Sequence, residues 1–380
     1  MGRASGLPST APYGKMVWMK DRHIPALDGI RGIAVLLVIA FHCRSILPAR
    51  GSVYLLLRVL DLGWSGVDLF FVLSGFLITG ILLDTRHIPT YFRTFYARRV
   101  LRIFPLYFVY LFLILVVVRF AAIWISGSDY WSSVHPWWYL TYLSNWQPGH
   151  GVKDKFLEHL WSLSIEEQFY CIWPTVIWIV RPRRLVWWCA PLLVLAPVFR
   201  WLVGMQADAA YRLTSCRMDT LMMGAIVAVG IREFRETCGR VVGYVLPAAS
   251  LGFLAVVVSL RDGFWNDSRM SVFGASLIAM VYACMVFAGA TCEAGPLARL
   301  LTAPLLRTCG KYSYAMYIVH LIVFQSLQPA VASLIGGRVS PFFLYAVFFS
   351  LVTGITLGAA WISWRAVEQP FLRLKRLFPY

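Results

Sequence analysis

Long apolar stretches, separated by short polar segments, run through almost the whole chain. Ten of them contain about 20 mainly apolar residues each, which is the length that an α-helix needs to cross the hydrocarbon core of a bilayer. They cover Leu27–Leu47, Leu62–Leu83, Ile103–Ile125, His159–Val180, Leu185–Val203, Thr214–Ile231, Val241–Leu260, Ser271–Thr291, Tyr312–Gln328 and Phe342–Trp364. The pattern predicts an all-α fold, a polytopic membrane helical bundle of about ten transmembrane helices.

The aromatic segment Trp137–Gln147 is too short to cross a bilayer and is typical of an interfacial or re-entrant segment. Ten spans with the N-terminus inside place 22 Lys and Arg residues in the inner segments and 8 in the outer loops. An additional span at Trp137–Gln147 would change the division to 15 and 15. Because inner loops are enriched in basic residues, this asymmetry predicts ten spans with both termini cytoplasmic.

The composition agrees with this fold class. Of 380 residues, 59% are hydrophobic and only 14% are charged, and the mean hydropathy is +0.67. Soluble domains are less apolar and more highly charged, so most soluble enzymes are excluded. No linker rich in Pro and Gly divides the chain, and no signal peptide is predicted. We expect a cytoplasmic N-terminal segment at 1–26, one transmembrane domain at 27–364 and a short cytoplasmic tail at 365–380.

The net charge of +17 does not indicate a nucleic-acid partner, because the basic residues fall in short clusters between apolar stretches. The eight cysteines show no Cys-x-x-Cys spacing, and several lie inside apolar stretches. We therefore expect neither a disulfide framework nor a metal site.

Charged side chains inside the spans need a partner, a water-filled cavity or a function, because burying a charge in hydrocarbon is costly. His42 lies toward the outer end of the first span, and Asp68 and Glu166 are expected at a similar depth. A carboxylate beside an imidazole makes it a useful general base, so His42, with Asp68 or Glu166 to orient it, is a candidate catalytic group. The alternative is a histidine whose hydrogen bonds are satisfied inside the bundle.

Other ionisable residues fall in the same predicted outer cluster. Adjacent side chains on a helix point about 100° apart, so only one of Glu166 and Glu167 is expected to face His42. Arg217 and Asp219 are candidates for substrate binding, and Arg217 could also offset charge on a carbonyl oxygen. His320 could be a core histidine or a residue of the substrate pathway.

Arginines gather on the expected inner side, before the third span. Arg98 and Arg102 share one helical face, and Arg99 and Arg102 lie three residues apart. Guanidinium groups at this spacing suit phosphate oxygens. The alternative is an anchor for anionic lipid headgroups.

Several segments, taken in order, resemble the acyltransferase-3 family of integral-membrane O-acyltransferases. The first contains Arg31 and His42 separated by ten residues. The others are Gly66–Phe76, Phe95–Pro105, His159–Tyr170, Arg217–Asp219, Gly310–His320 and Glu368–Pro370. Each segment alone is weak evidence for the family, but together the segments follow the family's order over nearly the whole chain.

The resemblance implies ten helices and transfer of an acyl group, often acetyl, from a cytoplasmic acyl-CoA to a cell-envelope carbohydrate or another glycosylated acceptor. It implies His42 as the catalytic histidine, Arg31 as its partner in the first helix, Arg99 and Arg102 as CoA contacts and Glu166 as an acid of the site. Acyl-CoA is then a co-substrate and no cofactor is bound. We expect a multi-pass protein of the bacterial plasma (inner) membrane.

Some members of the family continue into an extracytoplasmic hydrolase-like domain. The sequence ends at Tyr380, so we expect transfer directly to the acceptor or to a separate protein. A covalent relay through His42, Ser162 or Ser164 stays an alternative to direct attack.

The rival interpretation is a transporter or flippase of a glycolipid or small solute, in which intramembrane charges form the path. The absence of an evident internal repeat and the ordered motifs argue against it. A non-catalytic membrane scaffold would not explain why the ionisable residues His42, Asp68 and Glu166 lie inside the membrane spans.

Overall fold

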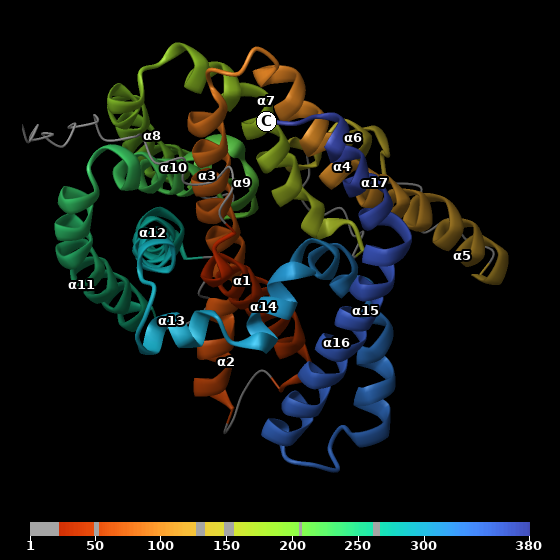
Figure 1. The fold of residues 1–380 in the computed structure, drawn as a ribbon. Coiled ribbons are helices and arrows are strands. Elements are labelled where there is room, and N and C mark those ends of the chain that lie inside the picture. The colour runs from red at the N-terminus through yellow and green to blue at the C-terminus, as the bar shows by residue number, and fades with distance from the viewer. Residues whose placement is uncertain (1–22, 49–52, 127–133, 148–155, 205–206, 261–266) are drawn as a thin grey trace, which may run out of the picture.

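The computed structural model describes residues 23–48, 53–126, 134–147, 156–204, 207–260 and 267–380. In these ranges the regular elements are all helices, and no strand occurs (Figure 1). The predicted all-α class is therefore confirmed.

Eight helical stretches among the described residues are long and apolar enough to cross a membrane. They contain α1 (Pro25–Cys43), α2 with α3 (Tyr54–Asp61, Gly66–Thr85), α4 with α5 (Tyr91–Phe112, Arg119–Ser126), α8 (Pro182–Val203), α11 (Arg235–Ser259), α12 (Ala275–Thr291), α15 (Ser313–Ile335) and α16 (Pro341–Ser363). The remaining α-helices are α6 (Trp137–Leu140), α7 (Trp161–Ile179), α9 (Ala207–Arg212), α10 (Met218–Glu233), α13 (Pro296–Leu301), α14 (Pro304–Lys311) and α17 (Gln369–Arg373).

Two of the ten predicted spans do not meet the length and composition expected of a spanning helix. The predicted span His159–Val180 forms α7, whose polar residues near its start lower its hydropathy. The predicted span Thr214–Ile231 forms α10, which has 16 residues and is therefore short. Trp137–Gln147 forms only the four-residue helix α6 and a 3-10 turn, so it does not cross as a helix.

Helices α1 and α3 lie at the centre of the bundle and pack against each other (Figure 1). Helix α10 packs closely along α3 because each helix presents a glycine to the backbone of the other. A Cβ at Gly75 would meet the carbonyl oxygen of Leu221, and a Cβ at Gly224 would meet that of Val72. Small residues allow this close approach of helix backbones in membrane proteins.

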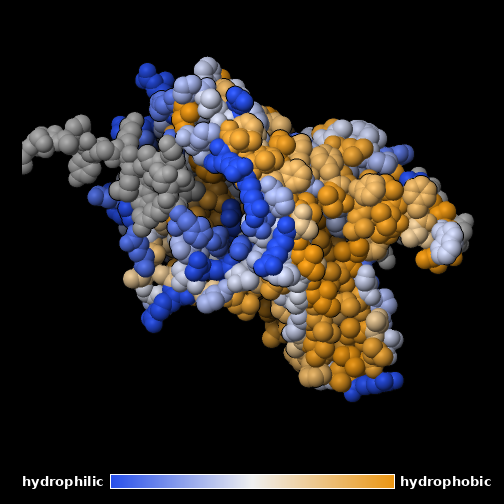
Figure 2. Space-filling view, turned by 45° about the vertical axis from the view of Figure 1, so that its right-hand side comes forward, coloured by the Kyte–Doolittle hydropathy of each residue, from blue (hydrophilic) through white to orange (hydrophobic). Residues whose placement is uncertain are grey.

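The outer helices carry exposed, large apolar side chains, as expected of surfaces that face lipid. Examples are Trp124 on α5, Trp187 on α8, Tyr244 on α11 and Phe343 on α16. Figure 2 shows a broad apolar face on one side and hydrophilic side chains gathered around a hollow. These features fit a multi-pass membrane protein.

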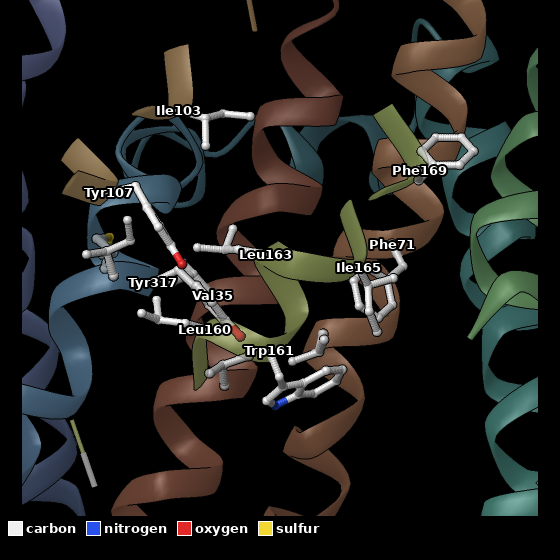
Figure 3. Close-up of a cluster of buried hydrophobic side chains, with 14 of the residues drawn as sticks. Val35, Phe71, Ile103, Tyr107, Leu160, Trp161, Leu163, Ile165, Phe169 and Tyr317 are labelled. Carbon is white, nitrogen blue, oxygen red and sulfur yellow. The ribbon is translucent and has the colours of Figure 1, made fainter. Parts of the chain in front are cut away.

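The largest buried cluster among the described residues joins many of the helices. Val35 of α1, Phe71 of α3, Tyr107 of α4, Leu163 of α7 and Tyr317 of α15 all belong to it (Figure 3). The start of α7 is inserted in this junction, and the 3-10 turn before it is also largely buried. The junction contributes to the walls of two cavities.

Candidate functional site

The first cavity is lined by arginines and encloses about 760 Å³, open solvent included. We call it the arginine cavity. Its walls come from α1, α3, α4, α7 and α15. The lining residues are Arg31, Val67, Phe70, Phe71, Ser74, Arg99, Arg102, Ile103, Ser162, Leu163, Glu166, Tyr170, Ser313, Tyr314 and Tyr317.

The cationic side of this cavity is only partly neutralised by nearby carboxylates. Arg31 lies 3.6 Å from Asp28, and Arg102 lies 3.4 Å from the buried carboxylate of Glu368. The Nε atom of Arg99 is buried and has no hydrogen-bond partner among the described residues. Because Arg31 and Arg99 come from different helices, the cavity can present guanidinium groups to an anion from two sides.

Glu166 lies in the arginine cavity, which corrects its predicted position beside His42. Its carboxylate accepts a hydrogen bond from the Ser74 hydroxyl, and the hydroxyls of Ser74 and Tyr170 lie 3.2 Å apart. The prediction counted depth from the start of the span at His159. His159 is buried, so α7 begins inside the bundle and not at the membrane surface. Glu166 therefore lies deeper than its residue count from His159 indicated.

The second cavity encloses about 870 Å³, open solvent included, and contains His42. We call it the histidine cavity. Its lining residues are Val38, Phe41, His42, Arg44, Trp64, Val67, Glu158, His159, Trp161, Tyr211, Arg212, Tyr317 and Leu321. Arg212 and Glu158 form an ion pair of 2.9 Å in its wall.

The imidazole of His42 is held by its own helix. Its Nδ1 atom lies 2.8 Å from the carbonyl oxygen of Val38, one turn earlier on α1. A carbonyl can only accept, so Nδ1 donates and Nε2 keeps its lone pair. A neutral imidazole with an available Nε2 is the form that a general base requires.

Two further histidines pack against His42. The ring centroids of His42 and His320 lie 5.0 Å apart, and those of His320 and His159 lie 5.3 Å apart. The Nδ1 atom of His320 donates to the carbonyl oxygen of Tyr317 at 2.6 Å, and Nε2 of His159 donates to that of Ile318 at 3.0 Å. His320 therefore lies at the site, which was one of the two alternatives for it. His159 was not predicted as a site residue, although it begins the segment His159–Tyr170 that resembles the family, and this was the available signal.

The two cavities adjoin, because Val67 and Tyr317 line both of them. The Tyr317 hydroxyl donates to the carbonyl oxygen of His159 at 3.0 Å and lies 2.6 Å from the Ser162 hydroxyl. Tyr317 was not predicted as a site residue. Its spacing of three residues from His320 places both on one face of α15, and this helical periodicity could have found it.

Asp68 does not contact His42, contrary to its predicted role. Its carboxylate lies 2.9 Å from the guanidinium group of Arg217, and both side chains are fully buried. Arg217 in turn stacks over the ring of Tyr211 at 4.6 Å, and Tyr211 lines the histidine cavity. Arg217 therefore lies behind the cavity wall and lines neither of the two cavities.

Asp219 also has a structural partner. Arg200 binds its two carboxylate oxygens at 3.1 and 2.7 Å, and Ser276 donates to one of them at 2.6 Å. All of these groups are buried. Sequence alone could not pair Arg200 with these groups, because Asp219 and Ser276 lie 19 and 76 residues away from it.

Glu167 faces away from both cavities. Its Oε1 atom is buried without a hydrogen-bond partner among the described residues. The two adjacent glutamates differ in direction, but neither lines the histidine cavity, so the expectation that one of them faces His42 is wrong. No group of three or more His, Cys, Asp or Glu side chains that could hold a metal ion occurs among the described residues.

Comparisons with known proteins match the chain to one family. The sequence model of the acyltransferase-3 family, described as an acyltransferase domain, matches residues 24–365. A Staphylococcus aureus (strain COL) protein, provisionally named an O-acetyltransferase, is 29% identical, with 93% of this chain and 58% of that relative covered. The O-acetyltransferase OatA of Staphylococcus aureus (strain NCTC 8325 / PS 47) is 28% identical, with 92% and 57% covered.

The chain thus spans less than three fifths of the length of these relatives. No solved structure matches significantly. The family match covers every helix from α1 to α16 and both cavities, so its extent does not depend on a single motif. The chain belongs to the acyltransferase-3 family.

Proposed function

We propose that this chain is a membrane O-acyltransferase that moves an acyl group, acetyl in the first instance, from acyl-CoA to a hydroxyl of a cell-envelope carbohydrate or another glycosylated acceptor. The proposal locates it in the bacterial plasma membrane with the donor on the cytoplasmic side. The names of the relatives, which describe O-acetyltransferases, support acetyl as the group.

The single observation that carries the proposal is the junction of the two cavities at Val67 and Tyr317. One cavity offers Arg31, Arg99 and Arg102 to the phosphates of CoA. The other offers the Nε2 atom of His42 to an acceptor hydroxyl. A long, flexible donor held by its phosphates could bring its thioester from the first cavity to the second.

The chemistry assigned to His42 is general base catalysis. Its Nε2 takes the proton of the acceptor hydroxyl as that oxygen attacks the thioester carbonyl. The new ester C–O bond forms and the C–S bond breaks, and the thiolate of CoA takes the proton back from the imidazolium. The Tyr317 and Ser162 hydroxyls lie at the junction, where the carbonyl oxygen would gain negative charge.

The histidine cavity suits an acceptor that carries a sugar. Its wall contains the rings of Trp64, Trp161 and Tyr211, and Tyr211 lies 4.8 Å from Trp161 between ring centroids. Aromatic rings offer apolar faces on which a sugar ring can stack, while hydroxyl groups need polar partners. Glu158 and Arg212, in the same wall, supply such partners.

Purified protein in lipid nanodiscs, incubated with acetyl-CoA labelled in the acetyl group, tests the proposal. We expect the label to appear as an ester on a carbohydrate acceptor from the producing cell envelope, with release of one free thiol for each ester formed. A His42→Ala protein that is folded and binds CoA provides the matched control and should be inactive. The absence of both transfer and thiol release across envelope acceptors would overturn the proposal in favour of a transporter.

A further inference from the structure

The chain segment after α16 lies across the arginine-bearing face of α4. The 3-10 helix η9 (Leu374–Leu377) packs against α4. The Thr94 hydroxyl donates to the carbonyl oxygen of Pro379 at 3.3 Å, and the guanidinium group of Arg98 stacks over the Tyr380 ring at 4.2 Å. This segment is therefore held in a defined position beside the arginine cavity.

The contact brings one more cation to a group of cations. Lys375 lies on η9, which packs against α4, so its ammonium group is added to the arginine group of that helix. Like charges repel one another, the more so where protein and lipid reduce the screening by water. A stable fold that gathers four cations in this way needs negative charge to offset them.

The described part of the chain supplies fewer carboxylates than cations at this place. Glu368 pairs with Arg102 at 3.4 Å, and Glu166 lies in the arginine cavity with Arg99. The Nε atoms of Arg98 and Arg99 are buried and have no hydrogen-bond partner among the described residues. Unpartnered buried donors are rare in folded proteins, and here they belong to groups that bind phosphate well.

We propose that Lys375, positioned by the segment that crosses α4, is a donor-binding residue that completes with Arg98, Arg99 and Arg102 a site for the phosphate groups of the CoA nucleotide. This inference rests on the proposed function and adds to it a residue outside the arginine motif. The guanidinium groups supply planar forks for phosphate oxygens, and the Lys375 ammonium supplies a compact point charge. A nucleotide with several phosphates matches a site with several cations better than a single carboxylate does.

The phosphate of an anionic lipid headgroup has the same chemistry, so the test must separate the two sources. Calorimetric titration with CoA compares the wild type with Lys375→Ala, both in nanodiscs of purely zwitterionic lipid and in nanodiscs that also contain anionic lipid. Arg376→Ala is the matched control, because Arg376 is exposed on the same 3-10 helix and its loss removes the same charge. Phosphopantetheine, which lacks the nucleotide, serves as the second ligand.

We expect Lys375→Ala to weaken CoA binding roughly tenfold, the usual effect of losing a charge-assisted contact, while Arg376→Ala changes it less than about twofold. Phosphopantetheine should bind equally well to wild type and Lys375→Ala. The Michaelis constant for acetyl-CoA should rise in parallel with the dissociation constant, and kcat should stay near that of the wild type. Lys375→Arg should retain most of the affinity.

Equal CoA binding by Lys375→Ala and Arg376→Ala would overturn the inference. So would an equal loss for CoA and phosphopantetheine, or a loss that occurs only when anionic lipid is present, since the latter identifies a headgroup site. Unchanged melting temperatures of the variants exclude misfolding as the cause. The proposed function fails separately, if wild-type protein binds CoA but transfers no acetyl group.

Discussion

The Nδ1 atom of His42 lies 2.8 Å from the carbonyl oxygen of Val38, so the ring is anchored by its own helix and not by a carboxylate. This relationship leaves Nε2 as the basic nitrogen in the histidine cavity. It also means that the orientation of the ring does not depend on Asp68, whose carboxylate is paired with Arg217. The backbone carbonyl thus does for His42 what a carboxylate does in many other sites.

The first prediction follows from this geometry. His42→Ala should lower kcat by about 10²–10⁴-fold, the usual contribution of a general base, while the affinity for CoA stays near that of the wild type. His42→Gln can still bond to Val38 but has no basic nitrogen, and it should be as inactive as the alanine variant. His135→Ala, at an exposed position, is the control. A folded His42→Gln protein with near-normal turnover would remove His42 from the mechanism.

The arginine cavity gives a second prediction. Arg99→Ala and Arg102→Ala should each raise the Michaelis constant for acetyl-CoA roughly ten- to a hundredfold, because each removes a charged hydrogen-bond donor to phosphate. Lysine at either position should restore part of the loss, since it keeps the charge without the fork. The exposed Arg365, replaced by alanine, serves as the control. Wild-type Michaelis constants in both alanine variants would make the arginines lipid anchors.

The residue shared by the cavities gives a third prediction. Tyr317→Phe keeps the ring but removes the hydroxyl that contacts Ser162 and the carbonyl of His159. We expect kcat to fall about tenfold or more while the Michaelis constant for acetyl-CoA changes little, because the hydroxyl acts at the junction and not on the phosphates. Tyr244→Phe, on the exposed face of α11, is the control. A change in the Michaelis constant alone would assign Tyr317 to donor binding.

Sequence patterns predicted the helices of this fold better than they predicted which buried side chains pair with each other. The positions of the helices follow from apolar stretches, which are local in sequence. The arginine face of α4 follows from residue spacing on one helix, which is local as well. The pairing of Asp68 with Arg217 is not local, because the two residues come from α3 and the turn before α10. Depth along a span assigns a residue to a level of the bundle but does not choose among the side chains at that level.

Glu166 shows a second limit of the same reasoning. Counting residues from the start of a predicted span assumes that the span starts at the membrane surface. α7 starts in the buried junction of several helices, a property of tertiary packing that no periodicity records. The family resemblance named Glu166 as a site residue without this error, because it rests on a motif and not on depth.

The close packing of α3 on α10 gives a fourth prediction, on stability. Gly75→Ala adds a methyl group where the carbonyl of Leu221 lies, and backbone cannot move aside as easily as a side chain can. Overpacking of this kind typically costs about 1–3 kcal/mol. We expect a lower melting temperature in detergent for Gly75→Ala and no loss for Gly243→Ala, whose added methyl group would meet nothing within 4 Å. Equal melting temperatures of the Gly75→Ala and wild-type proteins would mean that α3 and α10 can move apart without loss of stability.

The orientation of the chain in the membrane gives the last prediction. The excess of basic residues in alternate loops predicts that the start of α8 faces the cytoplasm and that the turn between α15 and α16 faces outward. Single cysteines at Arg183 and Arg338, both exposed, report on these two sites in a protein whose eight natural cysteines are replaced. In intact cells a thiol reagent that cannot cross the membrane should label the Arg338→Cys protein and not the Arg183→Cys protein. Both should react after the cells are permeabilised, which verifies that each thiol is accessible. Labelling of the Arg183→Cys protein alone would invert the topology and move the arginine cavity away from cytoplasmic acyl-CoA, so this experiment bears on the donor as directly as on the fold.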